Sequence, residues 1–139
     1  MPFSKNLAAR EIFTSGFSEL MGISYGPWKQ GESNISLEMR PHHLNRLGIT
    51  HGGVILTLLD VVCGMAGMYR PPGSPERPCV TVSLTTNFIA ATKTSAIYGS
   101  STLTSERKTL FYASGQLTDD AGVLLATATG VYKYLPSVN

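Results

Sequence analysis

The chain has 139 residues, of which 42% are hydrophobic and only 14% are charged, and its formal net charge is +2. This length predicts a single domain, residues 1–139, that can bury a core without disulfides or a metal. The small net charge argues against a nucleic-acid partner, and the low charged fraction excludes a disordered chain and suggests that some surface is hidden against another chain.

Two cysteines are too few for a disulfide framework and indicate a reducing compartment. No targeting signal is evident at the start of the sequence. The longest apolar run, residues 54–69, has 16 residues and carries Asp60 in its middle. A membrane span needs about 20 residues and tolerates a central carboxylate badly. We therefore expect a soluble, cytoplasmic protein without membrane contact.

The first part of the chain predicts short elements. Residues 6–21 are weakly amphipathic and predict a short helix or two turns, and residues 25–28 predict a turn. Apolar and polar residues alternate over 34–40, which predicts a half-buried strand. A proline ends this strand, and a polar loop follows at 42–50.

The most informative element is the apolar run that follows Gly52 and Gly53. It is too long for an ordinary strand, and its apolar residues fall on every side of a helical wheel. This pattern predicts a central helix that is buried on all sides. The small residues Gly64, Ala66 and Gly67 would let a neighbouring backbone approach this helix closely.

After a proline-rich loop at 71–75, the sequence alternates with period two. Consecutive strands joined by short turns predict an antiparallel meander. Together with the helix, they predict an α+β domain whose antiparallel sheet wraps around one central helix. We expect the strands near residues 80–85, 96–104, 109–118 and 123–135, with a turn at 119–122.

Asp60 is the one charged residue of the predicted helix. A buried, unpaired carboxylate is costly. Asp60 therefore either pairs with a backbone amide or an arginine and fixes the packing, or faces a cleft as a general base or nucleophile.

His51, Gly52 and Gly53 stand directly before this helix. Glycines there leave the first backbone N–H groups uncovered at the positive end of the helix dipole, which suits an oxyanion; an ordinary helix entry is the alternative. Gly52 and Asp60 are eight residues apart, or about 12 Å along one helix. If both act on one carbonyl, Asp60 must come from a second copy of the chain whose helix runs antiparallel.

The remaining candidates have simpler interpretations. Asn45 could bind a substrate carbonyl or a water, or merely stabilise its turn. His42 and His43 are adjacent, which suits surface loop residues better than shared metal ligands, and Cys63 is expected to be a buried, inert thiol. The sequence carries no zinc ligand set, nucleophilic serine elbow or phosphate-binding glycine motif.

The string HLNRLGITHGG at 43–53, followed by Leu58-Leu59-Asp60, resembles the hotdog-fold acyl-CoA thioesterases. The branch that looks nearest is the phenylacetic-acid-degradation type, and the resemblance covers nearly the whole chain. It implies a homodimer with a continuous sheet, usually paired into a homotetramer, with active sites at the subunit interface.

The resemblance also implies roles for particular residues. Gly52 would supply the oxyanion N–H, and His51 and Asn45 would orient the thioester or the attacking water. Asp60 of the other subunit would attack the carbonyl or activate water. Thr81 falls where the family often has a serine that places this water.

The turn Arg107-Lys108-Thr109 matches a segment that often contacts CoA phosphates; a merely solvated hairpin turn is the alternative. The reaction implied is hydrolysis of a small aromatic or short- to medium-chain acyl-CoA to the free acid and CoA, without a metal or other cofactor. A hotdog dehydratase, which would need a histidine base near the helix, and a non-catalytic acyl-CoA-binding or regulatory protein are the alternatives. Candidates for lining the acyl pocket are Leu58, Val61, Val62, Met65 and Phe88.

Overall fold

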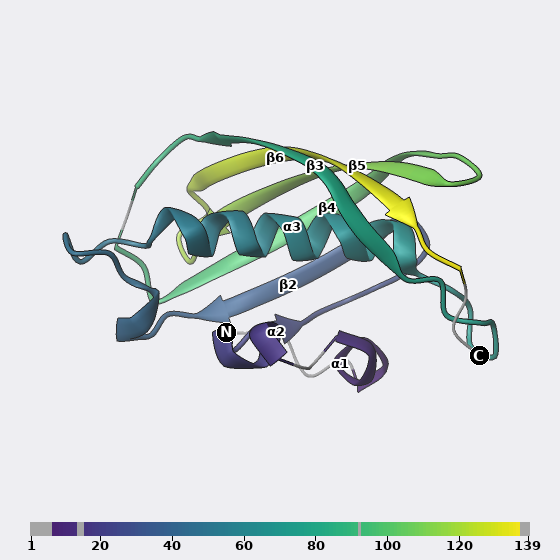
Figure 1. Ribbon diagram of the computed structural model, residues 1–139. Coiled ribbons are helices and arrows are strands. Elements are labelled where there is room, and N and C mark those ends of the chain that lie inside the picture. Colours follow the sequence, from purple (N-terminus) through teal and green to yellow (C-terminus); the bar gives the residue numbers. More distant parts are fainter. Residues whose placement is uncertain (1–6, 14–15, 92, 137–139) are drawn as a thin grey trace.

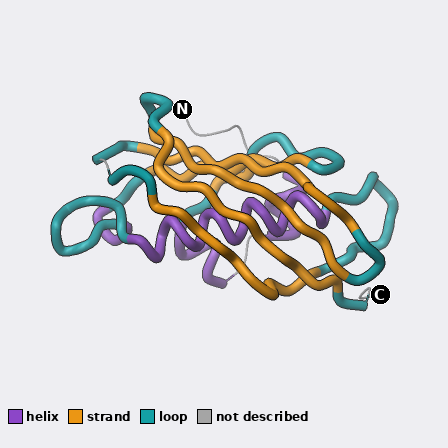
Figure 2. Tube along the Cα trace, turned by 90° about the horizontal axis from the view of Figure 1, so that it is seen from above, coloured by secondary structure: helices purple, strands orange, loops and turns teal. Residues whose placement is uncertain are grey.

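The computed structural model describes residues 7–13, 16–91 and 93–136. One long helix, α3 (Gly52–Met68), lies against a six-stranded sheet that curves around it (Figure 1). Seen from above, the strands cross the full length of the helix (Figure 2). The expected α+β arrangement, an antiparallel sheet around one central helix, is confirmed. None of the described helices is long and apolar enough to cross a membrane.

All neighbouring strands of the sheet are antiparallel, and their order is β1-β2-β4-β5-β6-β3. Strands β4, β5 and β6 form the expected meander, whereas β3 has β6 as its one partner among the described strands and lies at one edge of the sheet. The strands are β1 (Ser24–Tyr25), β2 (Glu32–Glu38), β3 (Cys79–Phe88), β4 (Ala96–Glu106), β5 (Leu110–Asp119) and β6 (Leu124–Tyr134).

The N-terminal segment forms two short helices, α1 (Leu7–Phe13) and α2 (Gly16–Met21), where one helix or two turns were expected. Gly16 has φ +49°, a conformation that glycine adopts most readily. Residues 6, 14 and 15 of the predicted segment lie outside the described residues. The turn expected at 25–28 begins later, because Tyr25 still pairs with Ile35 in the sheet.

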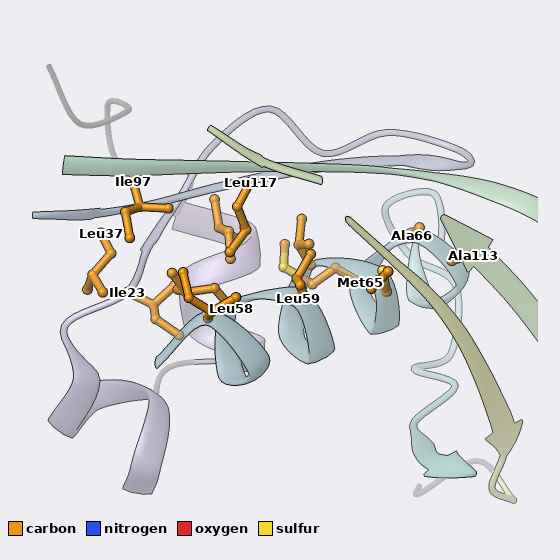
Figure 3. Close-up of a cluster of buried hydrophobic side chains, with 14 of the residues drawn as sticks. Ile23, Leu37, Leu58, Leu59, Met65, Ala66, Ile97, Ala113 and Leu117 are labelled. Atoms are coloured by element: carbon orange, nitrogen blue, oxygen red, sulfur yellow. The ribbon is translucent and has the colours of Figure 1, made fainter. Parts of the chain in front are cut away.

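The core fills the space between α3 and the sheet. Leu58, Leu59 and Met65 project from the helix toward strand residues such as Ile97 and Leu117, and all five are at most 1% exposed (Figure 3). Because the sheet curves around the helix, α3 contacts strands from both halves of the chain, from β2 to β6. Burial of this apolar surface is the main stabilising contribution to such a fold.

The small residues of α3 make room for aromatic rings of the sheet. A Cβ atom on Gly64 would lie 3.2 Å from Cε1 of Tyr132, and one on Gly67 would overlap the ring of Phe111. These two rings are buried and stacked, with centroids 4.9 Å apart. The expectation that a neighbouring backbone approaches here is therefore wrong, because the rings of β5 and β6 occupy the space.

The prediction that α3 is buried on all sides is also wrong for the single chain. Gly53 and Leu56 are exposed, and Thr57, Asp60 and Val61 are half-buried. Their spacing of three or four residues places all five on one face of the helix, which we call the open face. Hydropathy could not reveal this face, because Leu56 and Val61 are apolar although the described chain leaves them uncovered.

His43 is a buried structural residue, not the surface loop histidine that was expected; His42 is exposed as predicted. His43 closes the 3-10 helix η1 (Pro41–His43), and its ring is 1% exposed. Its Nδ1 accepts the backbone N–H of Arg40 at 2.9 Å, so neutral His43 carries its proton on Nε2 and donates to the Met21 carbonyl at 2.8 Å. Burial is the main reason why the pKa of His43 is lowered; the bond to Met21 opposes it, and the charges of His42 and Arg40 add to it.

Stability should therefore fall in acid. Because the folded pKa of His43 lies below the unfolded value, the neutral ring contributes stability above about pH 6.5, which is lost as the pH falls through the folded pKa. We expect Tm to drop between about pH 7.5 and pH 5. His43→Asn should lower Tm at pH 7.5 but flatten this pH dependence, as measured by thermal unfolding.

His42→Asn is the matched control, since His42 is exposed and adjacent. It should keep most of the pH dependence of the wild type, because burial, the main cause of the lowered pKa of His43, remains. Equal pH slopes for wild type and His43→Asn would show that His43 does not couple stability to pH.

Candidate active site

Asp60 lies at the middle of α3, on its open face, and a hydroxyl of the edge strand holds its carboxylate. Thr81 Oγ1 on β3 donates a hydrogen bond to Asp60 Oδ1 at 2.7 Å. None of the ion pairs between described residues involves Asp60. The pairing with an arginine that would make Asp60 merely structural is thus not seen, and the two residues expected to cooperate, Asp60 and Thr81, do meet.

A second hydroxyl, which the sequence did not single out, reaches the same residue. Tyr132 on β6 donates to the backbone carbonyl of Asp60 at 2.8 Å, and its oxygen lies 3.3 Å from Oδ1. Tyr132 stands directly opposite Thr81 in the β3–β6 pairing. The signals available in the sequence were indirect, namely a tyrosine in an alternating strand and Gly130 two residues before it.

The other titratable groups near Asp60 remain protonated at neutral pH. Burial, reinforced by the negative charge of Asp60, raises the pKa of the Cys63 thiol and of the Cys79 thiol to about 12. Burial, with further contributions from Cys63 and Asp60, also raises the pKa of Tyr132. Cys63 is buried, as expected, and its raised pKa agrees with an inert thiol. Within the described residues, no three His, Cys, Asp or Glu side chains are grouped to hold a metal ion.

Among the described residues, the hydrogen bonds at the N-terminus of α3 leave one first-turn backbone donor available. His51 is the N-cap, and its Nδ1 accepts the N–H of Gly53 at 2.8 Å, while its carbonyl accepts from Val54 and Ile55. Neutral His51 therefore carries its proton on Nε2. The N–H of Gly52 is the first-turn donor that none of these bonds uses, as an oxyanion-binding role requires.

Asn45 organises the loop before the helix. Its Oδ1 accepts the backbone N–H groups of Leu47 at 2.9 Å and Ile49 at 3.3 Å. This arrangement agrees with the turn-stabilising alternative for the side-chain oxygen. The side-chain nitrogen takes no part in these two bonds, so the substrate contact expected of Asn45 would fall to that nitrogen.

The structure brings the predicted residues together as two separate half-sites. One, at the start of α3, contains Asn45, His51 and Gly52; the other, at its middle, contains Asp60 and Thr81. Since Gly52 and Asp60 lie on the same helix, eight residues put them about 12 Å apart along the axis. A single chain does not place them around one carbonyl.

Both half-sites border exposed apolar surface. Leu56 on α3 is 40% exposed, and Val82 and Phe88 on the edge strand β3 are 58% and 59% exposed. The Phe88 ring also lies beside Gly52, 3.7 Å from where a Cβ would stand. Of the expected pocket residues, Phe88 and Val61 are accessible here.

Leu58, Val62 and Met65 do not line an accessible pocket, contrary to expectation. All three are at most 1% exposed and belong to the core between α3 and the sheet. Their positions on the helix point away from the open face. Hydropathy alone did not separate core-facing from substrate-facing residues.

The tip of the β4–β5 hairpin is an exposed, basic turn formed by Arg107, Lys108 and Thr109. The N–H of Arg107 donates to Leu110, and Arg77 donates to the Lys108 carbonyl. The turn is thereby held beside the loop that leads into β3. Its contact with CoA phosphates stays a prediction.

Residues 47–126 match the family model described as Thioesterase superfamily. No curated protein matches the chain in sequence. In structure, the chain is similar to zebrafish thioesterase superfamily member 2, with 29% identity, a TM-score of 0.77 and coverage of 91% of this chain and 92% of that chain. It is also similar to a conserved protein from Pseudomonas aeruginosa, with 26% identity, a TM-score of 0.81 and coverage of 91% and 99%.

A further structural neighbour is a Bacillus halodurans protein solved with CoA, with 24% identity, a TM-score of 0.78 and coverage of 95% of this chain and 87% of that chain. The segment matched by the family model spans more than half of the chain and contains Gly52, Asp60 and Thr81. By this match and by its fold, the chain belongs to the thioesterase superfamily and has the hotdog fold.

Proposed function

We propose that the protein hydrolyses acyl-CoA thioesters to the free acid and CoA, with Asp60 as the catalytic carboxylate. The observation that carries this proposal is the carboxylate of Asp60, held by the Thr81 hydroxyl on the open face of α3 in a thioesterase-superfamily fold. A carboxylate so placed is accessible and oriented. These are the properties that a general base or nucleophile needs.

The thioester carbonyl would bind at the start of α3. The unused N–H of Gly52 and the helix dipole favour the negative charge that develops on the carbonyl oxygen. His51 can add a donor through its Nε2–H, since its Nδ1 is already an acceptor. The nitrogen of Asn45 can orient the substrate or the water beside it.

Asp60 would then act on the carbonyl carbon in one of two ways. As a general base, it takes a proton from water while the water oxygen forms the new C–O bond and the C–S bond breaks, with CoA leaving as a thiolate. As a nucleophile, its oxygen forms a bond to the carbonyl carbon while the C–S bond breaks and CoA leaves as a thiolate; water then cleaves the resulting mixed anhydride to the free acid and restores the carboxylate. Either route needs only the carboxylate, water and the oxyanion donor, so we propose no metal or redox cofactor.

The reacting groups would come from two subunits. The edge strand β3 presents unpaired backbone groups together with the exposed Val80, Val82 and Phe88, the combination expected of a strand that pairs with another chain. Antiparallel pairing of two β3 strands would extend the sheet and bring Asp60 of one chain toward Gly52 of the other. We therefore propose a homodimer, and by the family resemblance a homotetramer.

The structural neighbours and the residues around the candidate site indicate the substrate class. Neighbours solved with CoA, from Bacillus halodurans, and with acetyl CoA, from Streptococcus mutans, support a CoA ester. Arg107, Lys108 and Thr109 would contact its phosphates. Val61 and Phe88 offer an apolar lining for a small aromatic or a short- to medium-chain acyl group, in line with the phenylacetic-acid-degradation branch. Acyl-CoA esters of this kind are cytoplasmic metabolites, and we place the protein there.

The geometry gives less support to the two alternatives. A dehydratase would use a histidine as base, but the Nδ1 of His51 is occupied by Gly53 and its Nε2 carries the proton. A binding protein would not need a carboxylate oriented by a hydroxyl beside the substrate. Hydrolysis uses both half-sites.

Asp60→Asn should abolish turnover while leaving the fold intact. The amide oxygen can still accept from Thr81, but an amide neither attacks a carbonyl nor takes a proton. We expect kcat to fall on the order of 10²-fold or more, measured as release of free CoA thiol from phenylacetyl-CoA and hexanoyl-CoA. Asp120→Asn is the control, because Asp120 is an exposed aspartate that also accepts a hydroxyl bond, from Ser95. Wild-type rates in Asp60→Asn would assign Asp60 a structural role.

Mixing two inactive variants tests the two-subunit site. Gly52→Pro removes the oxyanion N–H at the first helical position, where proline is well tolerated. Asp60→Asn removes the carboxylate, so each variant alone should be inactive. After co-refolding, half of the dimers are mixed and each has one intact site, so about a quarter of the wild-type activity should return.

Gly52→Ala is the control for this mixture, because it keeps the N–H and its Cβ would lie 3.7 Å from Phe88, an ordinary contact. It should remain active. Light scattering would establish that each variant keeps the wild-type assembly. A mixture that contains demonstrated heterodimers yet stays inactive would exclude the cross-subunit site.

A further inference from the structure

We propose that Tyr132 is a positioning residue for Asp60, which fixes the carboxylate so that Oδ2 is the reacting oxygen. This inference rests on the proposed hydrolysis and adds to it a residue that neither the sequence motif nor the family resemblance singled out. It is carried by the contacts between β6, β3 and the middle of α3.

Two hydroxyls from adjacent strands converge on Asp60. Thr81 on β3 and Tyr132 on β6 are direct partners across the sheet. Thr81 donates to Oδ1 at 2.7 Å, and Tyr132 donates to the backbone carbonyl at 2.8 Å with its oxygen 3.3 Å from Oδ1. Neither bond uses Oδ2. The two carboxylate oxygens are therefore not equivalent, because one is held by the protein and the other is left for water or for the carbonyl carbon.

The space for Tyr132 is created by glycines on both sides of its ring. A Cβ on Gly64 would lie 3.2 Å from Cε1, and a Cβ on Gly130 would lie 2.5 Å from Cε2. Gly64 stands one helical turn after Asp60, in the middle of a helix, where glycine is unfavourable. Glycine at position 64 lowers the stability of the helix, but it leaves room for the ring of Tyr132 to extend from β6 along α3 to Asp60.

Tyr134, two residues after Tyr132 on β6, offers a matched comparison. Tyr134 also faces α3, also packs against Phe111 with centroids 4.9 Å apart, and also donates to a helix carbonyl, that of Gly67 at 2.7 Å. The two tyrosines thus share their strand, ring partner and bond type. They differ in the carboxylate that the hydroxyl meets: the Tyr132 oxygen lies 3.3 Å from Oδ1 of Asp60, whereas the Tyr134 oxygen lies 2.9 Å from Oε1 of Glu106, away from the candidate site.

Tyr132→Phe should lower kcat about 10-fold while KM stays nearly unchanged, because the ring remains and only the hydroxyl that fixes Asp60 is lost. Tyr134→Phe should lose comparable thermal stability but keep kcat within about 2-fold. A purely structural role for Tyr132 would give the two variants the same kcat, and that result would overturn the proposal.

A double-mutant cycle with Thr81→Val tests whether both hydroxyls act on one carboxylate. Thr81→Val should itself slow hydrolysis about 10-fold. The double variant should lose less than the product of the two single losses, since a carboxylate already released by one substitution has less orientation left to lose. Simply multiplicative losses would show that the two hydroxyls act independently and would contradict the proposal.

Gly64→Ala gives a second route if Tyr132→Phe folds poorly. The added Cβ would lie 3.2 Å from Cε1 of Tyr132, so it should shift the ring and its hydroxyl relative to Asp60 without removing the hydroxyl. We expect kcat to fall while KM stays nearly unchanged. A folded Gly64→Ala variant with the wild-type kcat would overturn the proposal. A wild type that releases no CoA from any acyl-CoA would instead refute the hydrolysis itself, so the two failures are distinguishable.

Discussion

Side chains from the surrounding strands and loops donate hydrogen bonds to backbone carbonyls of the central helix. These bonds set the rotation of α3 about its axis, and the placement of the candidate site depends on that rotation. The carbonyl of Val62 accepts from Ser33 and Ser101, at 2.5 Å and 2.6 Å, and the carbonyl of Met65 accepts from the indole of Trp28 at 2.8 Å. Tyr132 and Tyr134 reach the carbonyls of residues on either side. Apolar packing is not directional, so it would hold α3 against the sheet without specifying its rotation. These donors specify that rotation.

The rotation of α3 decides where chemistry is possible. With the carbonyls held by β2, β4 and β6, the face that carries Leu58 and Met65 turns into the core, and the face that carries Asp60 turns away from it. The same orientation places Asp60 beside Thr81 on the edge strand. The open face and the exposed edge of β3 are thus consequences of one packing arrangement. Together they form the surface that a second subunit would cover.

The rigidity of the helix sets the second constraint on the site. An α-helix rises about 1.5 Å per residue, and no local adjustment brings Gly52 and Asp60 of one chain to the same carbonyl. On the proposed mechanism, the oxyanion donor and the carboxylate of one chain would therefore not serve each other. The proposed homodimer with antiparallel helices would resolve this separation and at the same time cover the apolar edge. Folding, assembly and catalysis would then depend on the same few residues around β3 and α3.

The sequence by itself determined the elements and the chemical candidates. The length of the apolar run predicted α3, the period-two alternation predicted β2 to β6, and the spacing of Gly52 and Asp60 predicted two half-sites. Such inferences succeed because each depends on local periodicity within one segment. What only the tertiary structure decided depends on segments far apart in the chain. The open face of α3, the buried ring of His43 against Met21, and the bond from Tyr132 to Asp60, 72 residues away, follow from how the sheet curves around the helix. Hydropathy identifies apolar residues, but it does not identify which of them the fold leaves uncovered, because that is set by the rotation of the helix against distant strands.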